Sequence, residues 1–155
     1  MPKTQKRSAP QGELRALTLF DALPDHHSTF LVDDDGSEPH LRRNEYAVVD
    51  TTDRSPAHGE LYLVQFSKEG QRHIKQLKAD QIHFDDNDEP SLAWWVTDLR
   101  GLRQTKERID GMPIFAGLSE GPYEGDGISS VLIGRIVGYA HSPLGRLFDG
   151  KAVRT

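Results

Sequence analysis

The apolar residues of this chain gather in short runs that are separated by glycine, proline and acidic residues, a pattern typical of β-strands. Strands are predicted over Thr29–Val32, Tyr46–Asp50 and Glu60–Phe66. A turn at Lys68–Gly70 joins the third of these to a return strand at Arg72–Leu77, so a hairpin is expected there. Strands outnumber helices, and the predicted fold class is therefore a mainly β single domain with short irregular helices.

The second half of the chain continues this pattern less evenly. Strands are predicted over Leu92–Thr97 and Ile128–Tyr139, and Gly134 and Gly138 are expected to mark a bulge or bend in the latter. The stretch from Asp98 to Gly127 is polar and rich in glycine and proline, so little regular structure is predicted there.

A length of 155 residues suits one domain. Residues 1–12 combine proline, glycine and basic residues without apolar periodicity, which predicts a disordered arm. Residues 13–28 form a linker, in which Glu13–Leu23 fits either a short helix or an irregular packed strip. The domain is expected over residues 29–140, followed by a C-terminal tail at 141–155.

Composition narrows the possible functions. The chain has 19 basic and 24 acidic residues, a net charge of −5, and this balance argues against broad nucleic-acid binding. No apolar run approaches the ~20 residues of a membrane span, and the basic start lacks the apolar stretch of a secretory signal. The absence of cysteine excludes a disulfide scaffold and a thiol nucleophile, and it favours the reducing cytoplasm.

Two residues could carry chemistry together. A serine hydroxyl attacks a peptide when a neighbouring base removes its proton, and a neutral lysine in an apolar setting can be that base. Ser37 follows a predicted strand in a glycine-containing loop, and Lys75 lies on a hairpin strand beside Ile74 and Leu77. Both residue types are common, so their spacing alone favours an ordinary turn serine and a surface lysine.

Several motifs in order add a family resemblance. The segment Val32–Leu41, VDDDGSEPHL, resembles the nucleophile segment V-x-G-D-S-M-E-P-T-L of the LexA, phage-repressor and UmuD self-cleaving peptidases. Arg72–Leu77, RHIKQL, is similar to the V-K-R-L that carries the lysine of that family. Further similarity lies at Asn44–Asp50, at His58–Val64 and at Val131–Gly138.

The resemblance implies a LexA/signal-peptidase-like β fold and a Ser-Lys dyad, with no cofactor and no metal. It also implies a homodimer, to which the strand at Ile128–Tyr139 could offer a free edge. Residues 78–127 have no counterpart in the family and are expected to form an insertion.

One departure from the family decides the functional prediction. Alignment on Glu38-Pro39 puts Gly36 where the family has its serine and Ser37 where it has methionine, while Lys75 matches the lysine. Successive side chains of an extended loop point different ways, so Ser37 is expected to aim away from the base. A misplacement of about 1 Å already costs about 10²-fold in rate. The favoured hypothesis is therefore a peptidase-like domain without proteolytic activity that acts in binding and dimerisation.

The sequence offers no obvious self-cleavage site. The family cuts itself at Ala-Gly or Cys-Gly between an N-terminal part and the peptidase domain. The only Ala-Gly here is Ala116-Gly117, inside the unmatched stretch, and the arm offers only Gln11-Gly12. The residues before Thr29 are too few for a helix-turn-helix domain, so the layout is closer to UmuD.

Two other functions stay open. In an active peptidase, Ser37 would attack, neutral Lys75 would accept its proton and backbone amides near Ser37 would hold the oxyanion. In a single-stranded nucleic-acid-binding module, the basic residues between Arg100 and Arg108 would act with Trp94 and Trp95. The acidic balance and an expected core position for at least one tryptophan make this binding possible but not favoured.

Metal binding is not expected. Several imidazole and carboxylate side chains lie in loops, but they lack the spacing of a calcium loop or a zinc site and fit solvated turn residues better. These residues are His26, His27, Asp33, Asp34, Asp35, His40 and His58.

Overall fold

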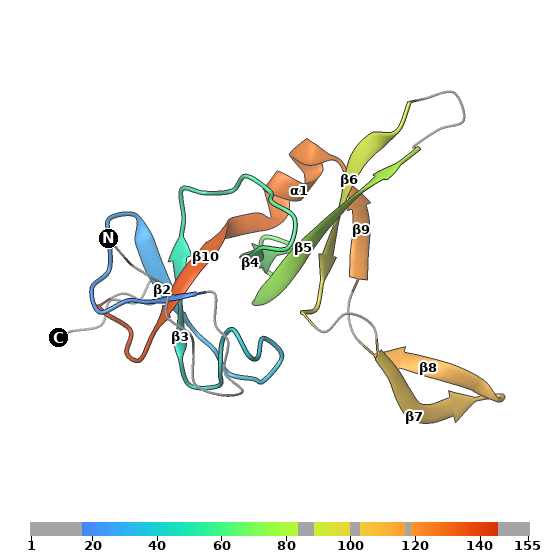
Figure 1. Ribbon diagram of the computed structural model, residues 1–155, viewed down its shortest axis with the longest axis horizontal. Coiled ribbons are helices and arrows are strands. Elements are labelled where there is room, and N and C mark those ends of the chain that lie inside the picture. The colour runs from blue at the N-terminus through green and yellow to red at the C-terminus, as the bar shows by residue number, and fades with distance from the viewer. Residues whose placement is uncertain (1–16, 84–88, 100–102, 117–118, 146–155) are drawn as a thin grey trace, which may run out of the picture.

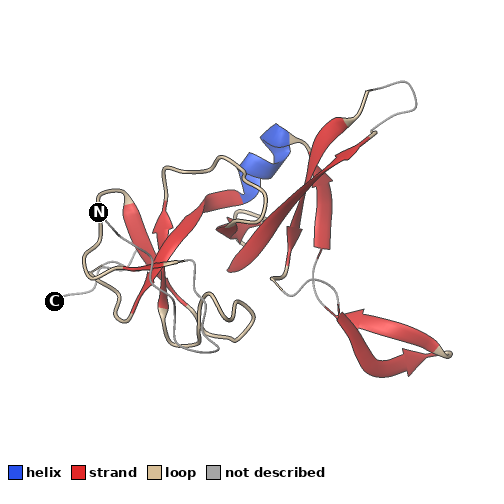
Figure 2. Cartoon of the chain, in the orientation of Figure 1, coloured by secondary structure: helices blue, strands red, loops and turns tan. Residues whose placement is uncertain are grey.

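The computed structural model describes residues 17–83, 89–99, 103–116 and 119–145. These residues form a mainly β structure, as the sequence pattern predicts (Figure 2). The arm at 1–12 and most of the C-terminal tail lie outside the described residues. The elements are β1 (Thr18–Leu19), β2 (His27–Leu31), β3 (Tyr46–Asp50), β4 (Leu61–Gln65), β5 (Arg72–Ile82), β6 (Ser91–Thr97), β7 (Arg103–Ile109), β8 (Met112–Ala116), β9 (Ser119–Tyr123), α1 (Gly125–Val131) and β10 (Leu132–Ala140).

In the described part of the chain, eight strands form one sheet and two form another. The main sheet has the order β2-β3-β10-β4-β5-β6-β9, and β1 lies alongside β10. All neighbours in it are antiparallel except β1 and β10. Strands β7 and β8 form a hairpin of their own, which stands apart from the main sheet in Figure 1.

Strand β10 lies inside the sheet, because β3 pairs with one side of it while β4 and β1 pair with the other. The prediction that this strand offers a free edge for dimerisation is therefore wrong. The strand is apolar because it is buried between neighbouring strands. Sequence alone cannot distinguish such a central strand from one that is covered by a partner, because both are apolar runs.

Strand β4 divides the core in two, because its alternating side chains are buried on both faces. Tyr62 and Val64 pack into one cluster with residues of β5, β6 and α1. Leu61 and Leu63 pack into the other, beneath the loop that follows β2. The second cluster includes Leu41, which is fully buried and anchors that loop.

The prediction of a strand from residue 128 onward is wrong at its start. Residues up to Val131 belong to α1, and the strand begins at Leu132. Ile128 and Val131 are three apart, so one turn of helix places both in the core, where they are buried. A short apolar run cannot be assigned to helix or strand by periodicity alone.

Gly134 and Gly138 lie at register shifts of β10, which confirms the predicted irregularities. A Cβ on Gly138 would lie 2.4 Å from the Thr18 carbonyl oxygen, so β1 approaches only because a side chain is missing there. This contact holds the described part of the N-terminal linker as an extended strip. The described linker residues form no helix.

The stretch from Asp98 to Gly127 is more regular than predicted. It contains β7, β8 and β9, and the Asp110-Gly111 turn joins the first two. Both turn residues have positive φ, 53° for Asp110 and 80° for Gly111, which is the backbone of a tight two-residue hairpin.

Among the described residues, no helix is long and apolar enough to cross a membrane.

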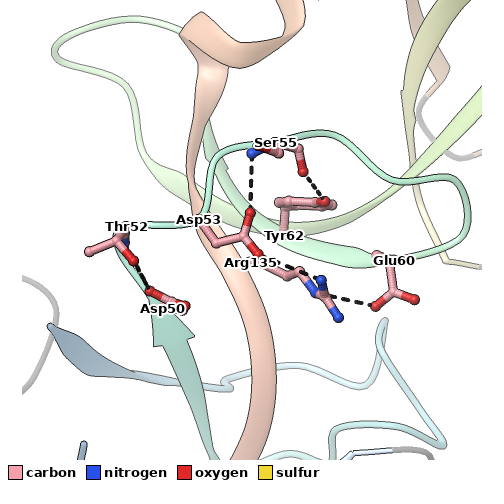
Figure 3. A network of polar contacts seen from close by, with 7 residues as sticks. All are labelled: Asp50, Thr52, Asp53, Ser55, Glu60, Tyr62 and Arg135. Atoms are coloured by element: carbon pink, nitrogen blue, oxygen red, sulfur yellow. Dashed lines mark hydrogen bonds and ion pairs between the residues drawn. The ribbon is translucent and has the colours of Figure 1, made fainter. Parts of the chain in front are cut away.

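Figure 3 shows how polar contacts fasten the loop between β3 and β4 onto β10. The Arg135 guanidinium lies 3.5 Å from a carboxylate oxygen of Asp53 and 3.5 Å from one of Glu60. The Tyr62 hydroxyl donates a hydrogen bond of 2.6 Å to the Ser55 carbonyl oxygen. Burial raises the pKa of Tyr62 above its usual 10.0, so the fold favours the uncharged phenol.

At the start of the same loop, the Thr52 hydroxyl donates a hydrogen bond of 2.7 Å to the Asp50 carboxylate. This bond lowers the pKa of Asp50 from its usual 3.8 and stabilises the charged form. The loop is thus held at both ends by side chains of the sheet.

Replacing Tyr62 tests this fastening. Tyr62→Phe removes the bond to Ser55 and is expected to lower the free energy of unfolding by about 1 kcal/mol at neutral pH, measured by urea unfolding. Because the folded pKa of Tyr62 is raised, its stabilisation is complete below pH ~10 and is lost as pH rises through the folded pKa. The variant should therefore lose less stability than wild type between pH ~8 and ~10.5.

Tyr123, whose pKa burial also raises, supplies the control, since Tyr123→Phe keeps the loop contact. Equal alkaline sensitivity of wild type and Tyr62→Phe would contradict the assignment.

Candidate functional site

The fold brings the two candidate residues, which are distant in sequence, to one cleft. Ser37 and Lys75 both line a cavity of about 610 Å³ between the loop after β2 and the start of β5. Residues 33–37 and 71–75 form most of its wall, together with Phe30, Val32, Asp98 and Leu99. The lining therefore combines apolar side chains with charged groups of both signs.

Hydrogen bonds fix the loop that carries Ser37. The Asp34 carboxylate accepts a bond of 2.9 Å from the Gly36 backbone amide, and the Arg43 guanidinium donates one of 2.7 Å to the Asp33 carbonyl oxygen. The Ser37 carbonyl oxygen accepts backbone bonds of 3.0 Å from His40 and from the buried Leu41. The loop thus turns tightly after Ser37 and is tied to the core.

Ser37 and Gly36 differ in exposure. Ser37 is 4% exposed, whereas Gly36 is exposed on the cleft wall. A Cβ at Gly36 would have its nearest contact with Asp34 Oδ1 at 3.3 Å. The position that sequence alignment matches to the nucleophile of the family therefore has room for a small side chain but carries none.

Lys75 is engaged elsewhere in the cleft. Its ammonium forms an ion pair with the carboxylate of Asp98, and the two side chains are 18% and 27% exposed. The described residues include no hydrogen bond between Lys75 and the Ser37 hydroxyl. A general base must lie within hydrogen-bond reach of the hydroxyl whose proton it takes. The arrangement thus opposes the role of general base.

Sequence reasoning missed Asp98, although the strand register contains a signal for it. The last paired residues of β5 and β6 are Gln76 and Thr97, so Lys75 and Asp98 are the next residues across this antiparallel pair. Opposite charges at facing positions are a common cross-strand pair. The register could not be known before the β5–β6 pairing itself was known.

The cleft also contains an edge of the main sheet. Strand β4 pairs with β5 over Arg72–Gln76, whereas β6 pairs with it only from Gln76 onward. Leu77 forms backbone hydrogen bonds with Gly59 and Glu60, which lie on the β4 side of β5. In an antiparallel strand the backbone N–H and C=O groups point to alternate sides from one residue to the next. Those of Ile74, three residues before Leu77, therefore point away from β4. The described residues place no strand against Ile74 on that side.

The structure also bears on the metal and nucleic-acid candidates from the sequence. The described residues contain no group of three or more histidine and acidic side chains that could hold a metal ion. Trp94 is buried in the core, so it cannot stack on a nucleic-acid base. Lys106 and Arg108 are exposed on the β7–β8 hairpin, and Arg100 lies outside the described residues.

Comparisons with protein-family models, with curated proteins and with solved structures find no match to this chain. The resemblance to the LexA-type peptidases therefore stays a prediction that depends on the sequence motifs.

A double-mutant cycle measures the Lys75–Asp98 contact. Lys75→Met and Asp98→Asn should each lower the free energy of unfolding by about 1–2 kcal/mol, because each leaves a largely buried charge without its partner. The double variant should lose less than the sum of the two, as measured by urea unfolding. Strictly additive losses would show that the two side chains do not interact.

Proposed function

We propose that this chain is a LexA-type peptidase-like domain that binds an extended peptide segment in its cleft without cleaving it. The unpaired edge of β5 at Ile74 is the observation that carries this proposal, because it offers a backbone donor and acceptor inside a cavity. Adding a strand to a sheet edge is a general mode of peptide recognition.

The chemistry of the cleft supports binding better than turnover. A Ser-Lys dyad needs a neutral lysine next to the nucleophile, but Lys75 pairs with Asp98 and the exposed loop position is Gly36. Ser37 would need the loop to change register before its hydroxyl could act, and that loop is fixed by backbone bonds to His40 and Leu41.

The lining indicates which peptides the cleft would accept. Phe30 and Leu99, which are half-buried, offer apolar contacts to the side chains on one face of an added strand. Asp33 is exposed at the cleft, and its carboxylate has no partner among the described residues. The preferred ligand is therefore an extended segment with apolar side chains on one face and basic ones near Asp33.

The absence of turnover is tested by mass spectrometry. Wild-type protein incubated at pH ~7 and at pH ~10, where lysine is more often neutral, should keep its full mass. Lys75→Ala is the matched control. A loss of mass that occurs in wild type and not in the variant would reveal an active Ser-Lys peptidase and overturn this part of the proposal.

The binding mode is tested with a capped peptide of about seven residues that alternates valine with lysine and threonine. Ile74→Pro removes the N–H that faces the cleft and spares the β4 ladder, in which Ile74 does not donate. Titration should show binding to wild type and its loss, by about tenfold or more, in Ile74→Pro.

Ile74→Ala is the control, since it removes the side chain and keeps the N–H. It should retain most of the affinity and have a comparable melting temperature to Ile74→Pro. Equal affinities of the two variants would exclude strand addition at this edge.

A further inference from the structure

The β7–β8 hairpin exposes apolar side chains at its tip. Ile109 is 64% exposed and Met112 is 65% exposed, and they are the most exposed large hydrophobic residues of the described chain. They face each other as a cross-strand pair next to the turn. Lys106 is exposed on the same hairpin, and its ammonium has no partner among the described residues.

A hairpin of this kind needs a partner. Two strands alone are marginally stable in water, because a single ribbon cannot bury its apolar side chains. Strands β7 and β8 pair only with each other in the described chain. Covering Ile109 and Met112 would stabilise the hairpin and remove an apolar surface from water.

The cleft has the complementary chemistry. Phe30 and Leu99 give it apolar surface, and the carboxylate of Asp33, which has no partner among the described residues, lies at its wall. The hairpin tip offers apolar side chains with a lysine behind them. Apolar groups would thus meet apolar groups, and the ammonium of Lys106 would meet the carboxylate of Asp33.

We propose that the cleft holds the β7–β8 hairpin tip of a second copy of this chain. The inference rests on the proposed function, since it names the occupant of the peptide-binding cleft. If each copy inserts its hairpin into the other, the two contacts are equivalent and the assembly closes as a twofold dimer. Two such contacts bury twice the area of one, which brings the interface nearer to the ~1,200–2,000 Å² of stable complexes.

The oligomeric state supplies the first test. Sedimentation equilibrium of the full chain should show a dimer, and Ile109→Ser/Met112→Ser should weaken its dissociation constant by about 100-fold. Both side chains are exposed, so the fold is unaffected. Leu92→Ser, which removes an exposed apolar side chain from β6, is the matched control and should leave the dimer intact. A wild-type chain that is monomeric, or a dimer that the hairpin variants leave unchanged, would overturn the inference.

A charge reversal identifies the contact. Asp33→Lys and Lys106→Asp should each weaken the dimer about tenfold, and the two together should restore it. Lys68→Asp makes the same charge change on an exposed turn and should have no effect. Weakening by the single variants without restoration in the double variant would place the hairpin elsewhere and overturn the inference.

Cross-linking distinguishes a second copy from the chain's own hairpin. The protein has no cysteine, so Asp34→Cys and Met112→Cys can be introduced singly without background. Mixing the two variants under mild oxidation should give a disulfide-linked dimer containing one of each. When both cysteines are placed in one chain, a disulfide that forms only within the monomer would show that the hairpin occupies its own cleft and overturn the inference.

The alternating peptide separates this inference from the proposed function. Added to Ile109→Ser/Met112→Ser, whose cleft is empty, the peptide should bind more tightly than to wild type, where the hairpin competes with it. Equal affinity of the peptide for wild type and variant would show that the hairpin does not occupy the cleft, and it would leave the proposed function intact. If the peptide does not bind the variant, the proposed function is wrong.

Discussion

The stagger of β5 between its two neighbours is the constraint on which the site depends. Strand β5 spans Arg72–Ile82, yet β4 pairs only with its first part and β6 only from Gln76 onward. Neither neighbour covers the whole strand, because β4 begins at Leu61, opposite Gln76, and β6 ends at Thr97, which also lies opposite Gln76. The stagger leaves a backbone edge at one end of the sheet, and the loop after β2 closes over it to form the cleft.

The same stagger determines the electrostatics of the cleft. Asp98 is the first residue beyond the paired part of β6, so its carboxylate reaches Lys75 across the end of the ladder. The Lys75 side chain is thereby directed at a carboxylate and forms no hydrogen bond with the Ser37 hydroxyl among the described residues. A cleft with apolar side chains, an available backbone edge and charges of both signs is suited to holding a polypeptide, and a reacting serine would need a different neighbour for its proton.

Much of the architecture could be predicted from sequence alone. The alternating and continuous apolar runs located β3, β4, β6 and the β4–β5 hairpin, and glycines marked the irregular points of β10. The predictions failed where local signals compete. The run at Ile128–Tyr139 combines a helical turn with a strand. In the hairpin of β7 and β8, the strong turn signal Asp110-Gly111 lies within a polar, glycine-rich stretch whose composition indicates irregular structure.

The sequence by itself determined the mainly β class and the candidate pair of Ser37 and Lys75, because side-chain periodicity and motif order are local properties. Only the tertiary structure decided what surrounds that pair. Asp98 becomes the partner of Lys75 through strand register, and Ser37 is buried because Leu41 draws its loop into the core. Both outcomes depend on which distant segments pack together, and pairing between segments far apart in the chain is not encoded in any single stretch of it.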